Sequence, residues 1–241
     1  MDDAFPLHVG AGKATALRVS SPDELEGAAR RLRLPTGRPV LVVVGGATGM
    51  SAGDADLLRT AVEDVLAPLA GRLAATVVDG ATDTGVMRVL GRARAQARQT
   101  YPLVGVVVDA LAATDDVTAG DTPLEPNHTH FLLVPGEEWG DESAWIARVA
   151  SVLAGGARAA TVLANGGEIA WNDVGCSVRD GRPVIALAGT GRTADVLATA
   201  VRGGAAEVPA STLAASGLVH AVDVSDHDGL ARLVQDLLGG S

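Results

Sequence analysis

The sequence predicts an α/β fold: a Rossmann-like, doubly wound and mostly parallel sheet with helices on both faces. Two observations support this prediction. Short, almost uniformly apolar runs alternate with segments of helical spacing along the chain, which is the pattern of a parallel sheet covered on both faces. Several of the apolar runs end in Gly-rich turns just before a helical segment, as in folds that bind ligands beyond the carboxyl ends of their strands.

The sequence of the first part of the chain predicts little regular structure. We expect residues 1–15 to be disordered or loosely docked and residues 16–19 to form a short strand. Ser21 then supplies a helix cap and Pro22 the first helical position, with acidic residues in the first turn. This helix should run to about Leu34, before a segment rich in Pro. We therefore divide the chain into an N-terminal extension, 1–37, packed on the core, and a main domain, 38–241.

The main domain alternates between the two kinds of element. Apolar runs predict strands at 40–44, 74–78, 103–108, 131–134, 159–163, 183–187 and 219–224. Helical spacing predicts helices at 54–69, 86–98, 142–153, 193–202 and 228–238. Residues 168–178 are ambiguous, with a helix slightly favoured. Residues 109–129 form a long loop rich in Asp, Thr and Pro, and so long a loop is usually functional or disordered.

Composition excludes several classes of protein. The net charge is −10, which argues against nonspecific binding to nucleic acid or to anionic membranes. The apolar runs are too short to cross a bilayer, and no secretory signal is evident, so we expect a cytoplasmic protein. The single cysteine, Cys176, excludes an internal disulfide framework. Lys13 is the only lysine, which argues against Schiff-base chemistry.

Four turns that follow predicted strands carry the candidate binding residues. Small residues and free backbone N–H groups at the start of a helix favour an anion such as a phosphate. Because these turns lie at the same edge of the sheet, we expect one composite site for a nucleotide-type ligand. The turns contain Gly45-Gly46-Ala47, Thr82-Asp83-Thr84-Gly85-Val86-Met87, Asn165-Gly166-Gly167 and Gly189-Thr190-Gly191-Arg192.

These turns match neither of two common phosphate motifs. No Lys-Ser/Thr follows Gly85, so the second turn is not a Walker A loop, and the turn after residue 44 is not G-x-G-x-x-G. Thr84 or Asp83 could also simply cap the following helix. Arg192 lies in the first turn of a helix, where a cation is mildly unfavourable. This placement indicates pairing with a phosphate, although the arginine could instead reach a surface carboxylate.

Other polar residues leave alternatives open. His128 and His130 could face one way on a strand, but without an evident third ligand a structural role in fixing the long loop is favoured over a metal site. Glu168 could act as a general acid or base, or could be a simple first-turn carboxylate. Trp139 and Trp171 are the aromatic residues nearest the turns that could stack on a base, although core packing is the commoner role.

The motifs together resemble the SLOG domain at the cytosolic N-terminus of melastatin-type TRP channels, and most closely its stand-alone prokaryotic branch, LSDAT. The similarity covers about residues 38–225. Its specific segments are Gly80-Ala81-Thr82-Asp83-Thr84-Gly85-Val86-Met87 and Pro126-Asn127-His128-Thr129-His130-Phe131. The resemblance implies a Rossmann-like domain that binds nucleotide-derived ligands, with ADP-ribose bound in some channels, and it places Arg192 at a phosphate-contacting position.

The chain also departs from its relatives. Val44 stands where the channels often have Thr, and the P-G-G-x-G-T-x-x-E motif of the related phosphoribohydrolases is absent. We therefore expect a binding or sensor protein for ADP-ribose, NAD or a related nucleotide, with no required cofactor and no metal. A nucleotide N-glycosidase that uses Glu168 or Asp83 is the alternative. Folds of this class often dimerise, so a homo-oligomer remains open.

Overall fold

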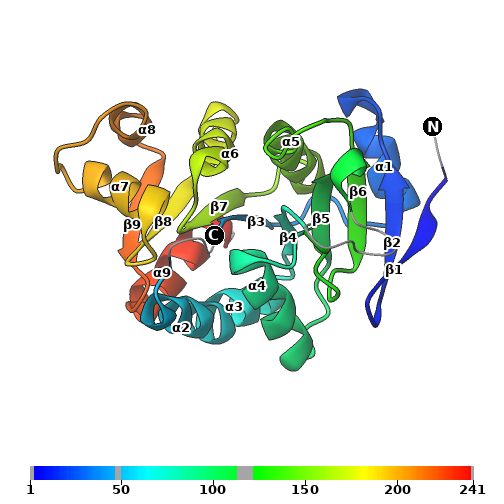
Figure 1. Cartoon of the computed structure of the whole chain (residues 1–241), viewed down its shortest axis with the longest axis horizontal. Helices are drawn as coiled ribbons and strands as arrows, with labels where there is room; N and C mark the ends of the chain where they lie inside the picture. The colour runs from blue at the N-terminus through cyan, green and yellow to red at the C-terminus, as the bar shows by residue number, and fades with distance from the viewer. Residues whose placement is uncertain (1–2, 47–49, 113–121, 240–241) are drawn as a thin grey trace.

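A mixed β-sheet organises the chain. The computed structural model describes residues 3–46, 50–112 and 122–239. Within these residues the sheet has nine strands in the order β1-β2-β6-β5-β4-β3-β7-β8-β9 (Figure 1). Only β1 and β2 pair in antiparallel fashion, and all the other strand pairs described are parallel. The predicted mostly parallel α/β fold is confirmed.

The strands match most of the apolar runs. They are β1 (Phe5–Val9), β2 (Gly12–Arg18), β3 (Val40–Gly45), β4 (Thr76–Asp79), β5 (Leu103–Val108), β6 (His130–Val134), β7 (Ala159–Ala164), β8 (Val184–Ala188) and β9 (Val219–Asp223). Every residue of β4, β5 and β8 is buried. Such strands need cover on both faces of the sheet, which explains why they read as unbroken apolar runs rather than as alternating ones.

The helices provide that cover. They are α1 (Leu25–Arg31), α2 (Ala52–Ala61), α3 (Ala67–Arg72), α4 (Gly85–Gln96), α5 (Ser143–Ala154), α6 (Glu168–Arg179), α7 (Arg192–Val201), α8 (Ala210–Ala215) and α9 (His227–Leu238). A π-helical turn, Val62–Leu66, joins α2 to α3, and short 3₁₀ helices lie at Pro22–Glu24 and Asp109–Leu111. Residues 168–178, which the sequence left ambiguous, belong to a helix.

Two apolar clusters lie on opposite faces of the sheet. One contains the buried residues of α1, α5, α6, α7 and α8, and the other those of α2, α3, α4 and α9. The two sets of helices are separated by the sheet in Figure 1, which confirms the doubly wound arrangement. None of the helices in the described residues is long and apolar enough to cross a membrane.

The prediction of disorder at the N-terminus was wrong for the residues that the structure describes. Residues 5–18 form a hairpin, in which Phe5 pairs with Ala16 and Val9 with Gly12. Its second strand then pairs with β6 in parallel and extends the main sheet. Leu7 is buried between two half-exposed apolar residues of the same strand face, and Gly10 has a φ of 54° in the turn. This alternation and turn glycine are ordinary hairpin signals.

Two other parts of the chain differ from the expectation. Helix α8 was not predicted, because its six residues are too few to show a helical period. The long loop 109–129 is partly structured, since Leu124 forms an antiparallel bridge with Thr82. Residues 113–121 of that loop, and Ala47 of the first Gly-rich turn, lie outside the described residues.

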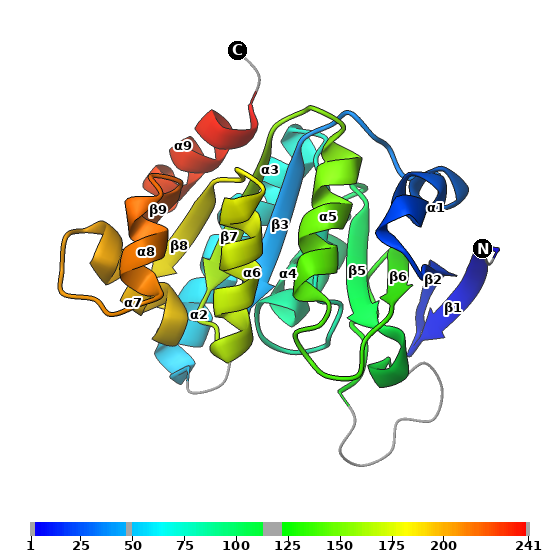
Figure 2. The ribbon, with the colours of Figure 1, turned by 90° about the horizontal axis from the view of Figure 1, so that it is seen from above.

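The order of strands changes direction beside β3. From β3 the chain adds β4, β5 and β6 on one side and then returns through α5 to place β7 on the other side (Figure 2). Strands β3 and β7 pair as far as their ends, where Gly45 lies opposite Ala164. In open α/β sheets, a crevice for ligands forms outside the carboxyl ends of the strands at such a point.

We predict that Gly45→Ala destabilises the protein by about 3 kcal/mol or more, because overpacking and backbone strain add at this residue. The φ of Gly45 is 134°, and a Cβ there would clash with the carbonyl oxygen of Ala164. Gly175→Ala, within α6, has room for a methyl group and should be neutral or stabilising. Chemical denaturation of both variants tests this, and equal stability would contradict it.

Candidate functional site

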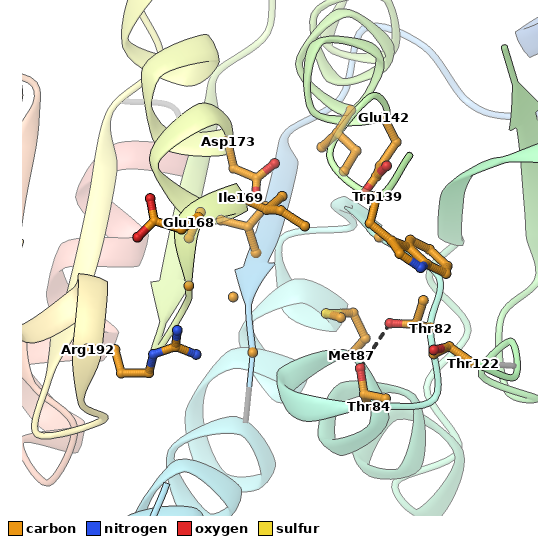
Figure 3. Close-up of a pocket in the computed structure, with 17 residues that line it drawn as sticks. Thr82, Thr84, Met87, Thr122, Trp139, Glu142, Glu168, Ile169, Asp173 and Arg192 are labelled. Carbon is orange, nitrogen blue, oxygen red and sulfur yellow. Dashed lines mark hydrogen bonds between the residues drawn. The ribbon is translucent and has the colours of Figure 1, made fainter. Parts of the chain in front are cut away.

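A cavity of about 330 Å³ lies at the switch point between β3 and β7. All four predicted turns contribute at least one residue to its lining (Figure 3). The predicted residues in the lining are Gly45, Gly46, Thr82, Thr84, Met87, Gly167, Glu168 and Arg192. Trp139, considered from the sequence as a stacking residue, also lines it. The sequence missed other residues of the lining, among them Thr122, Glu142, Ile169 and Asp173. The composite site predicted from separate turns therefore exists as one concave surface.

The end of β3 forms the floor of the cavity. Gly46 donates its backbone N–H to the carbonyl of Ala164 at 3.2 Å, which holds the chain close to β7 beyond the last strand pair. Gly45 and Gly46 carry no side chain, so the backbone itself faces the cavity. Small residues at this edge allow a ligand to approach the main chain closely.

The turn between β4 and α4 forms one wall. The hydroxyl groups of Thr82 and Thr84 lie 3.0 Å apart and share a hydrogen bond. Thr84 is the N-cap of α4, but its side chain makes no capping hydrogen bond. The N–H groups of the first turn therefore keep their capacity to bind an acceptor, which favours an anion at this helix end. Capping by Thr84, the alternative considered from sequence, is not observed.

Asp83 does not face the cavity. Its carboxylate accepts a hydrogen bond from Nε of Arg88 at 2.8 Å, and its carbonyl accepts another from the same guanidinium. The neighbouring Gly85 and Val86 also lie outside the lining, and Val86 is fully buried in the core beneath α4. Asp83 therefore orders the turn through Arg88 and is a poor candidate for an acid or base acting on a ligand.

A buried ionic cluster supports the threonine turn from behind. Nε2 of His128 lies 2.7 Å from Oδ1 of Asp79, and Nδ1 lies 2.9 Å from Oε2 of Glu125. All three side chains are essentially inaccessible to solvent. The backbone N–H groups of Ala81 and Asn127 are bound by the same two carboxylates. The cluster joins the segment around 125–128 to the end of β4.

The cluster explains the histidine pair of the sequence. Burial alone would lower the pKa of His128, but the adjacent Asp79 and Glu125 outweigh it and raise that pKa to about 9. His130 instead contacts the hydroxyl of Thr129 at 2.8 Å and begins β6. Across the described residues no three His, Cys, Asp or Glu side chains are grouped to hold a metal ion. His128 has the structural role in fixing the loop that the sequence favoured.

The start of α6 and the arginine beside it form the opposite wall. Gly167, the N-cap of α6, has no side chain to cap the helix. A Cβ on Gly167 would lie 3.0 Å from Nη2 of Arg192, so the guanidinium lies directly over this helix end. Arg192 is exposed, and in the part of the chain that the structure describes no carboxylate forms an ion pair with it. It remains available to an anion.

The backbone at Arg192 is unusual. Its φ is 50°, in the left-handed region that a non-glycine residue adopts at some energetic cost. The side chain points into the cavity (Figure 3), and its guanidinium lies close to Gly167. A strained residue that holds a free cation over a cavity is typical of a binding site.

Several predicted residues lie behind this wall instead of in it. Asn165 donates its amide to the carbonyl of Thr190 at 2.8 Å, and Thr190 donates its hydroxyl to Leu187. The N–H of Gly189 is taken by the carboxylate of Asp195 at 2.7 Å. The structure thus does not bring Asn165, Gly166, Gly189, Thr190 and Gly191 into the cavity lining. They connect the ends of β7 and β8 and so fix the position of Arg192.

Two carboxyl groups occupy the far end of the cavity. Glu142 precedes α5 and Asp173 lies in the middle of α6, and both are buried although they line the cavity. Burial raises the pKa of Asp173 to about 7, with a smaller contribution from Glu142 and an opposing one from the Ser143 hydroxyl. Burial also raises the pKa of Glu142. Oδ1 of Asp173 has no hydrogen-bond partner among the described atoms.

One tryptophan lines the cavity. Trp139 is 39% exposed and lies between Glu142 and the threonine turn (Figure 3). Trp171 instead packs against the core cluster on the α5 and α6 face of the sheet. Across from Trp139, Ile169 of α6 is 37% exposed. An exposed indole beside an apolar side chain is suited to stack on a planar ring.

The fold and the site define a Rossmann-like α/β protein with a cavity at its topological switch point. Comparison with known proteins makes the assignment specific. The family model described as "SLOG in TRPM, prokaryote" matches residues 38–231, most of the chain. The chain belongs to this family, as the sequence motifs indicated.

Comparison of structures agrees on the fold. The X-ray structure of TM1055, a target of the Northeast Structural Genomics Consortium, matches with a TM-score of 0.55. The match covers 82% of this chain and 99% of the other, at 18% identity. This likeness supports the architecture alone. A search of curated protein sequences found no match.

We predict that His128→Gln lowers the free energy of unfolding by about 3 kcal/mol, because it leaves two buried carboxylates without their partner. The raised pKa of His128 also gives a sign to the pH dependence. Its contribution is complete below the unfolded pKa of 6.5 and is lost as the pH rises through about 9. Denaturation from pH 6 to 10 should show this loss in the wild type and not in the variant.

Asp173→Asn should have the opposite effect. The carboxyl is protonated more readily in the folded state, so wild-type stability falls as the pH rises from 3.8 through about 7. The amide cannot ionise, and the variant should be more stable at pH 8 by on the order of 2 kcal/mol. The gain should shrink toward zero as the pH approaches 4. A thermal melt of both proteins at several pH values tests this, and a destabilised variant at pH 8 would refute it.

Proposed function

We propose that the protein is a binding or sensor protein for a nucleotide with a diphosphate, of the ADP-ribose or NAD type. The observation that carries the proposal is the convergence of three anion-binding elements on one cavity. Two helices, α4 and α6, begin there without a side-chain cap, and Arg192 lies over the second of them without an ionic partner among the described residues. Each helix end binds a phosphate readily.

The position of the site and the family support the same proposal. The cavity lies where open α/β sheets bind nucleotides, and its size is at the lower end of the range for small-molecule sites. Gly45 and Gly46 would let a ribose or a phosphate lie against the backbone. The phosphates would lie between the Thr82–Thr84 turn and Arg192. The sequence predicted contacts from the Thr82–Met87 turn, from Gly189–Gly191 and from Arg192, and the proposal keeps all but the contact from Gly189–Gly191, which lie outside the lining.

An enzyme that cleaves an N-glycosidic bond is the second candidate. One observation favours it: the carboxylate-bearing Glu168 lines the cavity next to Arg192, where it could reach a bound nucleotide. Incubation with nucleoside monophosphates and NAD, followed by chromatography, distinguishes the two functions. Release of free base that is lost in Glu168→Gln would establish the enzyme. Intact nucleotide would support the binding protein.

We predict that Arg192→Ala weakens the binding of ADP-ribose by about 10- to 100-fold, which is the contribution of a charge-assisted hydrogen bond. Arg192→Lys should recover only part of the affinity, because it lacks the forked geometry. Arg148→Ala removes an exposed arginine of α5 outside the cavity and should leave affinity unchanged. Calorimetry with ADP-ribose, NAD and AMP tests the proposal, and the absence of binding to all three would overturn it.

A further inference from the structure

The cavity is electrically polarised along its length. Arg192 lies at one end, over the first turn of α6, and the carboxyl of Asp173 lies at the other with Glu142 (Figure 3). Asp173 is six residues beyond Gly167 on the same helix, so the two ends are about 9 Å apart at 1.5 Å per residue. A phosphate is favoured at the first end and excluded from the second by the acidic groups. A bound nucleotide therefore has one orientation, with its phosphates at Arg192.

The acidic end has unused hydrogen-bonding capacity. Asp173 is only 9% exposed, and its Oδ1 has no hydrogen-bond partner in the described part of the chain. One oxygen of Glu142 accepts the N–H of Gly140 at 2.9 Å, which fixes the carboxyl relative to the Trp139 loop. A buried polar atom without a partner is destabilising unless a ligand or water completes it. This end is thus shaped to receive donors from a ligand.

The neighbouring aromatic residue indicates which part of the ligand lies there. Trp139 precedes Glu142 by three residues and lines the same side of the cavity, with Ile169 across from it. An indole and an aliphatic side chain can hold a flat ring between them, and a ribose has no flat face to offer. The separation from Arg192 also suits the base, the part of a nucleotide farthest from its phosphates.

We infer that Glu142 and Asp173 recognise the edge of an adenine base that carries the 6-amino group, and so select 6-amino over 6-oxo purine nucleotides. This inference rests on the proposed function. Glu142, whose carboxylate is already held by the N–H of Gly140, is the ionised member and accepts the N6–H of adenine. Asp173 carries the proton and donates it to N1. Burial raises the pKa of Asp173 to about 7, so its protonated form is populated near neutral pH. Hypoxanthine presents an acceptor, O6, in place of the N6–H donor, and a donor, N1–H, in place of the N1 acceptor. It therefore mismatches both carboxyl groups.

The test compares ADP-ribose with inosine diphosphate ribose by calorimetry. We expect the wild type to prefer the adenine form by about 10-fold or more, the discrimination typical of mismatched hydrogen bonds in a buried site. Glu142→Gln and Asp173→Asn should each move the ratio toward one, because an amide both donates and accepts. Glu138→Gln changes an exposed carboxylate of the same loop outside the cavity and should leave the ratio unchanged.

The ratio of affinities separates recognition from mere folding, since a destabilised variant would bind both ligands more weakly in equal measure. Equal binding of the two ligands by the wild type overturns the inference and leaves the proposed function in place. The inference is also overturned, with the proposed function left in place, if neither amide variant changes the ratio of the two affinities. The same variants can be tested with ADP-ribose and its 2′-deoxy and 3′-deoxy forms. If the wild type prefers ADP-ribose to the deoxy forms and both variants lose this preference, the carboxyls bind ribose and the inference is overturned. Failure of every nucleotide to bind overturns both proposals.

Discussion

The backbone pairing of β3 with β7 is the constraint on which the rest of this structure depends. These two strands are far apart in the sequence, and the strands between them, β4, β5 and β6, all lie on one side of β3. Because they pair in register to Gly45 and Ala164, the turns after β3, β4 and β7 open onto one cavity. A shift of one residue would turn every buried side chain of a strand to the other face of the sheet. The register of this single pair therefore fixes both the core and the site.

Support for the cavity comes from two polar assemblies that never touch it. The Asp79, His128 and Glu125 cluster holds the threonine turn, and the Asn165 and Thr190 pair holds the turn that carries Arg192. Both consist of buried groups that hydrogen-bond to one another, an arrangement that rigidifies its surroundings. The residues that face the ligand are thus few, while the residues that place them are spread over four segments of the chain.

The sequence predicted the parts of this structure that have local signals. Apolar runs identified the strands of the main domain, and Gly-rich turns identified Gly45, Thr82, Gly167 and Arg192. It predicted that these turns share one edge of the sheet, but not which of their residues face the cavity, because this depends on the packing of each turn. It also missed Glu142 and Asp173, whose burial results from the packing of α5 against α6. The sequence did contain one signal for the burial of Asp173. This residue shares a helix face with Ala170, Val174 and Ser177, all of which are buried.

Several residues around the cavity depart from what folding alone would choose. Arg192 has a left-handed backbone, Asp173 is a buried carboxyl with an unpartnered oxygen, and two helices begin without side-chain caps. Each of these features makes the native state less stable than it would be with a residue suited to that position. Substitutions chosen only to raise the melting temperature would therefore converge on this region. A thermostable variant made in that way would keep its fold and lose its site.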